Sequence, residues 1–147
     1  MKKLVAFACL SIAALVPQVQ AQDGCFNSLL RGQYSFVVSG TFGGAPFAAT
    51  GQTIYDGLGN AQGVIQVSSN GTLYAATTWT ATYSVKAMST TPTGGGPTVC
   101  VLNKTITIPG YNNLLVSFFG TAGGDYNELR FIATTPGSTL SGTARKL

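Results

Sequence analysis

The sequence predicts an all-β protein built as an antiparallel up-and-down meander of about eight strands. Beyond the first 21 residues, no long stretch places its apolar residues at helical spacing, and glycine, threonine, valine, isoleucine and aromatic residues predominate. Short strand-like runs alternate with turn residues, so consecutive runs are joined by hairpins. A meander of this size closes most simply into a barrel, which leaves no edge strand. A β-sandwich is the alternative.

The expected strands follow one another at short intervals. Gly43-Gly44, Asn70-Gly71 and Pro136-Gly137 suit tight hairpin turns between them. The longest break, residues 87–97, is expected to be a mobile loop or an insertion. The strands are expected at residues 33–42, 46–55, 61–69, 72–78, 79–86, 98–108, 114–119, 128–135 and 138–146, where 72–78 and 79–86 form one bent strand or two.

The first 21 residues have the layout of a secretory signal peptide. Lys2 and Lys3 precede an apolar run at 4–16, and Val19-Gln20-Ala21 is a small-residue cleavage pattern. The run is too short to span a bilayer comfortably, and no later stretch is long enough. We expect cleavage after Ala21, a single β-barrel domain over residues 22–147, and export to the periplasm or the medium.

The charge pattern argues against nucleic acid as a partner. Of eight basic residues, Lys2 and Lys3 leave with the signal peptide, which leaves six scattered basic residues against four acidic ones. An outer-membrane barrel would fit export and the number of strands. Its lipid-facing positions need alternating apolar residues and aromatic girdles, and the last run, 138–146, provides neither.

Two cysteines, Cys25 and Cys100, follow the signal peptide. An even number in an exported chain indicates one disulfide, and two buried free thiols are the alternative. The bridge would close a loop of about 75 residues and stabilise the fold by roughly 3–5 kcal/mol.

The stretch YDGLGNAQG, residues 55–63, is interpreted as a structural turn. Calcium takes six or more oxygen ligands, and Asp56 is the sole carboxylate here, so no metal site is predicted. A phosphate-binding loop would open a helix, whereas this chain continues as a strand. Asp56 and Asn60 are expected to hydrogen-bond the turn backbone, and Gly57 and Gly59 to adopt positive φ.

Catalytic constellations are scarce. The chain has no histidine, which excludes Ser-His-Asp triads, Cys-His nucleophiles and nearly all common zinc sites. Asp125 and Glu128 are close in sequence, but nothing indicates that they face each other across a cleft, as a glycosidase needs. No catalytic residue and no cofactor is assigned.

Several stretches together resemble a group of small exported bacterial proteins with no settled activity. The resemblance implies a barrel of calycin type, a class that includes lipocalins and allene oxide cyclase, with an apolar cup. Gly32-Gln33-Tyr34 stands where lipocalins have Gly-x-Trp. The matching stretches are LRGQYSF (30–36) after Cys25, YDGLGNAQG (55–63), NGT (70–72), TATYSV (80–85), Cys100 and LSGTA (140–144).

These observations favour an exported, non-catalytic barrel that binds a small apolar ligand in its interior. Small residues at strand positions would leave space that aromatic side chains on other strands do not fill, and Glu128 or a tyrosine hydroxyl would orient the ligand. The expected ligand-binding residues are Tyr34, Phe36, Trp79, Glu128 and Phe131. The small residues are Ala48, Ala49, Ala75, Ala76, Ala81, Ala133, Gly40 and Gly51.

Two alternative functions remain open at this level. A barrel whose core is filled by its own side chains would act through its outer surface. A cyclase or isomerase of the allene-oxide-cyclase type would use the shape of the pocket, with Glu128 or a tyrosine as its polar group.

Overall fold

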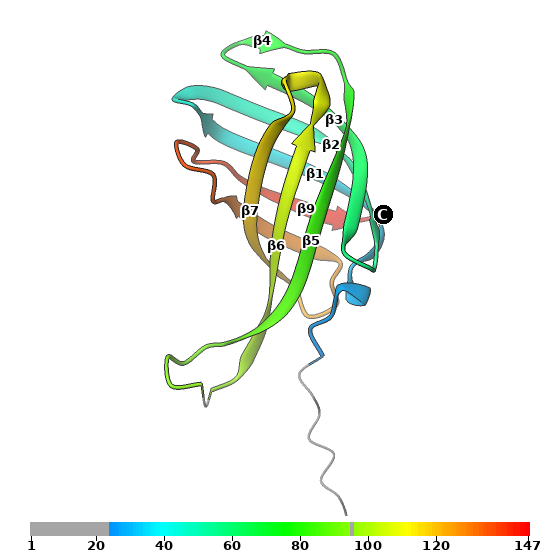
Figure 1. Cartoon of the computed structure of the whole chain (residues 1–147), viewed down its shortest axis with the longest axis vertical. Helices are drawn as coiled ribbons and strands as arrows, with labels where there is room; N and C mark the ends of the chain where they lie inside the picture. The colour runs from blue at the N-terminus through cyan, green and yellow to red at the C-terminus, as the bar shows by residue number, and fades with distance from the viewer. Residues whose placement is uncertain (1–23, 95) are drawn as a thin grey trace, which may run out of the picture.

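The computed structural model describes residues 24–94 and 96–147, and it forms a closed antiparallel β-barrel (Figure 1). The expected signal peptide, residues 1–21, lies outside the described residues. The elements are η1 (Asn27–Leu29), β1 (Arg31–Phe42), β2 (Ala45–Asp56), β3 (Asn60–Ser69), β4 (Thr72–Leu73), β5 (Thr77–Ser89), β6 (Thr98–Ile108), η2 (Pro109–Tyr111), β7 (Leu114–Ala122), β8 (Glu128–Ala133) and β9 (Ser141–Lys146).

Strand pairing settles the choice between barrel and sandwich. Each strand pairs antiparallel with its neighbours in the order β2-β1-β9-β8-β7-β6-β5-β3, and β2 also pairs with β3, which closes the ring of eight. The short β4 pairs with β3 alone and stays outside the ring. The predicted all-β barrel is therefore confirmed. Neither helix among the described residues is long and apolar enough to cross a membrane.

Several strand boundaries differ from the expected ones. The expected strands at 72–78 and 79–86 are two strands of very different length, because β4 ends at Leu73 and β5 begins at Thr77. The expected break at 87–97 is shorter, since β5 continues to Ser89 and its hairpin with β6 projects beyond the barrel wall (Figure 1). Cross-strand hydrogen bonds sustain these residues as strands, although their own sequence resembles a loop.

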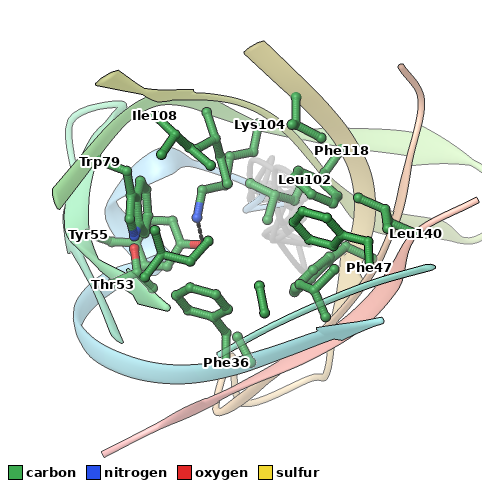
Figure 2. A pocket seen from close by; sticks show the side chains of 17 residues that line it. Phe36, Phe47, Thr53, Tyr55, Trp79, Leu102, Lys104, Ile108, Phe118 and Leu140 are labelled. Carbon is green, nitrogen blue, oxygen red and sulfur yellow. Dashed lines mark hydrogen bonds between the residues drawn. The ribbon is translucent and has the colours of Figure 1, made fainter. Parts of the chain in front are cut away.

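Period-2 alternation separates the interior from the surface. Along β5, Trp79, Ala81 and Tyr83 are buried, whereas the intervening Thr78, Thr80 and Thr82 are exposed. The threonines make the outer face of β5 polar without charged residues. Figure 2 shows inward side chains from several strands gathered inside the barrel.

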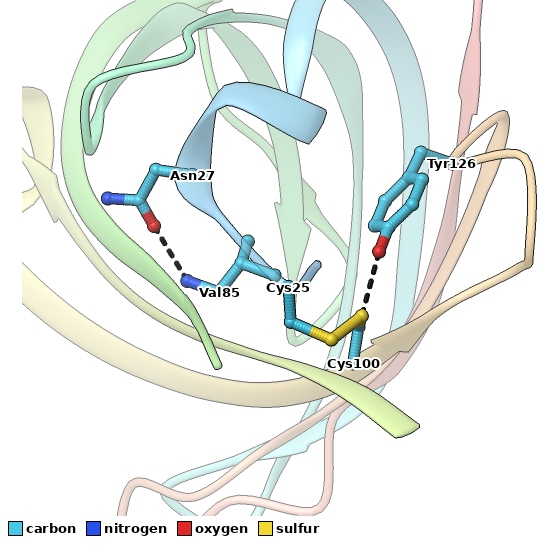
Figure 3. The surroundings of a disulfide bond; sticks show 5 residues. All are labelled: Cys25, Asn27, Val85, Cys100 and Tyr126. Carbon is cyan, nitrogen blue, oxygen red and sulfur yellow. Dashed lines mark hydrogen bonds between the residues drawn. A yellow bond between two sulfur atoms is a disulfide. The ribbon is translucent and has the colours of Figure 1, made fainter. Parts of the chain in front are cut away.

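The N-terminal segment covers one end of the barrel. Leu30, after η1, is fully buried, and Asn27 Oδ1 accepts a hydrogen bond from the Val85 amide at 2.7 Å (Figure 3). A disulfide joins Cys25 to Cys100 on β6, with 5.4 Å between the two Cα atoms. The expected disulfide is confirmed, and it fastens the end cover to the barrel wall.

The turn between β2 and β3 lies at the same end. Asp56 Oδ1 accepts hydrogen bonds from the amides of Leu58, Gly59 and Asn60 at 2.7–3.0 Å, and Asp56 Oδ2 accepts one from Asn60 Nδ2 at 2.8 Å. Gly57 and Gly59 have φ of 79° and 117°, which residues with a Cβ rarely adopt. In the described part of the chain no cluster of acidic or cysteine side chains could hold a metal ion.

Removing the disulfide should destabilise the barrel substantially. The bridge spans 75 residues of sequence, so a Cys25→Ser/Cys100→Ser double variant should lose about 3–5 kcal/mol of unfolding free energy, because its unfolded chain is less restricted. Urea denaturation followed by Trp79 emission measures the loss. Equal stability of the oxidised wild type and the double variant would contradict this prediction.

The Asp56 turn should make stability depend on acid pH. The Asn60 side-chain hydrogen bond, with help from the three amides, lowers the pKa of Asp56 from 3.8 to about 2. A lowered carboxyl pKa stabilises the folded state above about pH 4, and this stabilisation is lost as pH falls towards 2. The wild type should therefore melt at a higher temperature than Asp56→Asn at pH 6, and the difference should vanish near pH 2.

Thermal melting from pH 6 to pH 2 tests this turn, and calcium supplies the control. A gap in melting temperature that stayed constant with pH would contradict the role of the ionised carboxylate. A large calcium-dependent rise in melting temperature, lost in Asp56→Asn, would show instead that the turn binds metal.

Candidate functional site

The barrel interior is packed around a small apolar cavity of about 40 Å³ (Figure 2). Drug-sized ligands occupy pockets of roughly 300–1,000 Å³, so the protein's own side chains fill most of this interior. The cavity is lined by Phe36, Val38, Phe47, Ala49, Thr53, Tyr55, Ile65, Trp79, Leu102, Lys104, Ile106, Ile108, Val116, Phe118, Phe131, Leu140 and Ala144.

The cavity is small because aromatic rings lie over inward-facing glycines. A Cβ placed on Gly51 would come within 2.9 Å of the Phe36 ring, and one on Gly63 within 2.9 Å of the Trp79 ring. These two glycines therefore make room for rings from neighbouring strands, and little open space is left. Ala48, expected to leave such space, faces outward on β2 instead, and Ala75 and Ala76 are exposed in the break between β4 and β5.

Lys104 carries its amine into this apolar interior from β6. Its Nζ donates a hydrogen bond to Tyr55 Oη at 3.0 Å. The same nitrogen lies 4.7 Å from the centre of the Tyr55 ring and 4.4 Å from that of Trp79, distances at which a cation is attracted to the ring faces. Part of the residue remains accessible to solvent, but the amine itself is enclosed by these rings.

The amine lacks a carboxylate partner in the cavity. Among the residues that line it, the titratable ones are Tyr55 and Lys104. Burial lowers the pKa of Lys104 from 10.5 to about 7, because the charged ammonium has lost its water. A substantial share of the protein therefore holds a neutral, nucleophilic amine at neutral pH.

Two further polar groups face the same region without a hydrogen-bond partner. Thr53 Oγ1 and Trp79 Nε1 are buried and make no hydrogen bond to the protein. The Thr53 hydroxyl lies close enough to the Tyr55 hydroxyl to lower the pKa of Tyr55 slightly. The two groups are not arranged to form a hydrogen bond, so Thr53 Oγ1 stays without a partner. Thr53 and Trp79 lie in one cross-strand row, since each pairs with Gly63 on β3. Both groups can donate to an acceptor in the cavity.

A layer of tyrosines forms the floor between the cavity and the end cover. The Tyr55 ring packs edge-to-face on Tyr34 and Tyr83, with centroid distances of 5.3 and 5.0 Å. Tyr34 donates to the Tyr126 carbonyl at 2.8 Å, and Tyr83 donates to the Leu30 carbonyl at 3.0 Å. Burial raises the pKa of all three ring-stacked hydroxyls, so they remain protonated at neutral pH.

The structure places the expected ligand-binding residues in three locations. Phe36, Trp79 and Phe131 line the cavity, whereas Tyr34 belongs to the tyrosine floor. Glu128 lies elsewhere. Its carboxylate accepts a hydrogen bond from Arg130 Nε at 2.9 Å and lies 3.3 Å from a terminal nitrogen of Arg145, and the side chains of both arginines are largely exposed. The Arg130 hydrogen bond lowers the pKa of Glu128. Glu128 is therefore not placed to orient a ligand inside the barrel.

Lys104 and Thr53 were missed as site residues. The run LNKTITI places Lys104 in register with Leu102, Ile106 and Ile108, all of which are buried. Period-2 alternation alone assigns Lys104 to the inner face. That signal was present in the sequence, whereas the meeting of Lys104 with Tyr55 and Trp79 depends on three different strands.

The fold and this interior define a class: a closed eight-stranded barrel with a small apolar cavity and one enclosed amine. Comparison with solved structures finds a redesigned β-barrel, 20% identical over 82% of this chain and 94% of that one, with a TM-score of 0.49. A second redesigned β-barrel, mFAP1 bound to DFHBI, is 19% identical over 82% and 97%, also at 0.49. Likeness this low leaves the barrel assignment resting on strand pairing.

No family model matches the sequence, and no curated protein matches it.

Replacing Lys104 by an apolar residue should stabilise the protein. At pH 7, Lys104→Met should raise the unfolding free energy by roughly 1–4 kcal/mol. Converting the whole pKa shift at about 1.4 kcal/mol per unit would give a larger value, but the residue is partly accessible, so only part of that free energy is expected. Because the pKa of Lys104 is lower in the folded state, the charged amine reduces the unfolding free energy. The reduction is complete below about pH 7 and disappears as pH rises towards 10.5. The gap between variant and wild type should therefore narrow from pH 7 to pH 9.5.

Urea denaturation across this range measures the gap. Lys86→Met is the matched control, since Lys86 is exposed on the neighbouring strand β5 and its removal relieves no buried amine, so it should not stabilise the protein. A Lys104→Met variant that is no more stable than wild type at pH 7 would mean that the amine is well solvated.

Proposed function

We propose that the barrel binds, without catalysis, a compact apolar molecule that carries one hydrogen-bond-accepting oxygen. The observation that carries this proposal is the set of donors around the cavity. The Lys104 amine, the Trp79 indole N–H and the Thr53 hydroxyl lie among apolar side chains, and no carboxylate lines the described cavity to accept from them.

Leaving such donors unpaired is costly. A buried polar group without a partner destabilises a fold by about 1–3 kcal/mol. A ligand oxygen that accepts from Trp79 and Thr53 would recover much of that loss, and its apolar part would contact Phe36 and Phe131. The same unpaired donors would reject an analogue that lacks an acceptor, which gives the site its selectivity.

The size of the cavity restricts the ligand further. An apolar cavity of about 150 Å³ in another protein accepts benzene, and about 40 Å³ is available here. The ligand we propose therefore has a few non-hydrogen atoms, or enters with a small movement of the lining side chains. Long-chain and polycyclic molecules are excluded by the rings that cover Gly51 and Gly63.

We further propose that the protein works outside the cytoplasm as a calycin-like barrel. The Cys25–Cys100 disulfide supports an oxidising compartment, either the periplasm or the medium, after removal of residues 1–21. The up-and-down strand order around the ring supports the resemblance to calycin-type barrels. Residues 22–147 would then form the single working domain.

Trp79 provides a direct test, because it is the one tryptophan in the sequence and it lines the cavity. Titration with isobutyramide, a compact carbonyl compound, should change Trp79 emission saturably. Ala49→Val adds volume on the inner face of β2 and should weaken binding about tenfold or more.

Ala48→Val is the matched control for this titration. Ala48 precedes Ala49 on the same strand and is exposed, so the same added volume should leave binding unchanged. The absence of a saturable response in the wild type would overturn the proposal and favour a barrel that acts through its outer surface.

A further inference from the structure

We propose that Lys104 makes ligand binding covalent and reversible: its amine condenses with a compact apolar aldehyde to form an imine inside the barrel. This inference rests on the proposed function, because it uses the same cavity and the same donors. It goes beyond that function by naming the ligand class and the bond that is formed.

The position of Lys104 separates it from the other lysines that the structure describes. Lys86 and Lys146 are exposed on the outside of the barrel, where their ammonium groups are solvated. The amine of Lys104 faces an apolar cavity, with Tyr55 Oη at 3.0 Å and the Trp79 ring at 4.4 Å. A desolvated amine without a carboxylate partner is the environment in which lysine reacts with carbonyl compounds.

The condensation balances without any oxidant or reductant. The lone pair on Lys104 Nζ attacks the carbonyl carbon, a C–N bond forms, and the oxygen takes up a proton to give a carbinolamine. The C–O bond then breaks, the hydroxyl leaves as water with a second proton, and the nitrogen, having given up both of its protons, forms the C=N bond. One water is released for each imine formed.

The neighbouring groups match the needs of each step. The low pKa of Lys104 supplies neutral amine at neutral pH, which attack requires. Trp79 Nε1 and Thr53 Oγ1 are free to donate to the carbonyl oxygen, where negative charge develops during attack. Tyr55 Oη, next to the nitrogen, can exchange a proton with it, since burial keeps this hydroxyl protonated.

The rings also favour the product. When the imine is protonated, its positive charge lies where the ammonium now lies, facing the Tyr55 and Trp79 rings. The apolar lining limits the water that would hydrolyse the imine. The cavity volume again selects compact aldehydes, and isobutyraldehyde is a suitable probe.

Reductive trapping tests the bond. The mature protein is incubated with isobutyraldehyde at pH 7 with cyanoborohydride, and intact mass and peptide mapping follow. We expect one isobutyl group on Lys104, introduced at least about tenfold faster than on Lys86 or Lys146, which are exposed on the outside of the barrel and have no cavity groups to assist the reaction. Isobutyramide, which cannot form an imine, should slow the labelling of Lys104 in the wild type.

Two variants complete the experiment. Lys104→Arg keeps a donor and a charge but cannot form an imine, so it should lose the fast labelling. Lys86→Arg should leave the fast labelling of Lys104 unchanged. Competition by isobutyramide in the wild type gives an answer even if Lys104→Arg folds poorly.

The outcomes separate this inference from the function on which it rests. If isobutyramide changes Trp79 emission but Lys104 is labelled no faster than Lys86, the covalent step is wrong and the binding function stands. If neither binding nor fast labelling is found, both are wrong. Fast labelling of Lys104 that isobutyramide does not slow would place the reaction outside the proposed site and would also overturn the inference.

Discussion

Closure of the sheet is the constraint on which the rest of this structure depends. Because β2 pairs with both β1 and β3, and β9 returns to β1, each of the eight strands other than β4 has one face inside the ring. Such a ring is just wide enough for packed side chains or one small ligand. Each inward residue must therefore be matched in size to those on the strands opposite.

Size matching across the ring explains both the filled core and the small cavity that remains. Gly51 and Gly63 give up their own volume to the rings of Phe36 and Trp79. The tyrosine floor, η1 and the disulfide close the end of the barrel below these rings. The volume that is left lies beside Lys104 and the unpaired Thr53 hydroxyl and Trp79 indole groups.

Enclosing the Lys104 amine lowers the stability of the fold, and good packing of the interior does not require it. An apolar residue at position 104 would fill the interior without desolvating a charge, and the rings of Tyr55 and Trp79 offset only part of that penalty. Local departures from the best packing are typical of functional sites, where stability is given up for chemistry. Lys104, Thr53 and Trp79 form such a departure inside an otherwise regular barrel.

The sequence by itself determined the local features of this protein. Period-2 alternation separates the two faces of strands such as β5, turn residues placed the hairpins, and two cysteines indicated the bridge from Cys25 to Cys100. Strand ends were less predictable, as at Ser89, because cross-strand hydrogen bonds extend a strand beyond its own preference. The same alternation could have placed Lys104 inside, but its partners could not be read from it.

Only the tertiary structure decided which inward residues meet. Tyr55, Trp79 and Lys104 lie on three strands, and their distances depend on register, twist and closure, which no single segment encodes. The volume of the cavity is likewise a small difference between the space inside the ring and the summed side chains that fill it. Glu128 illustrates the same limit. A shift of one residue in strand register would turn its carboxylate into the barrel, whereas the observed pairing places it outside, next to Arg130.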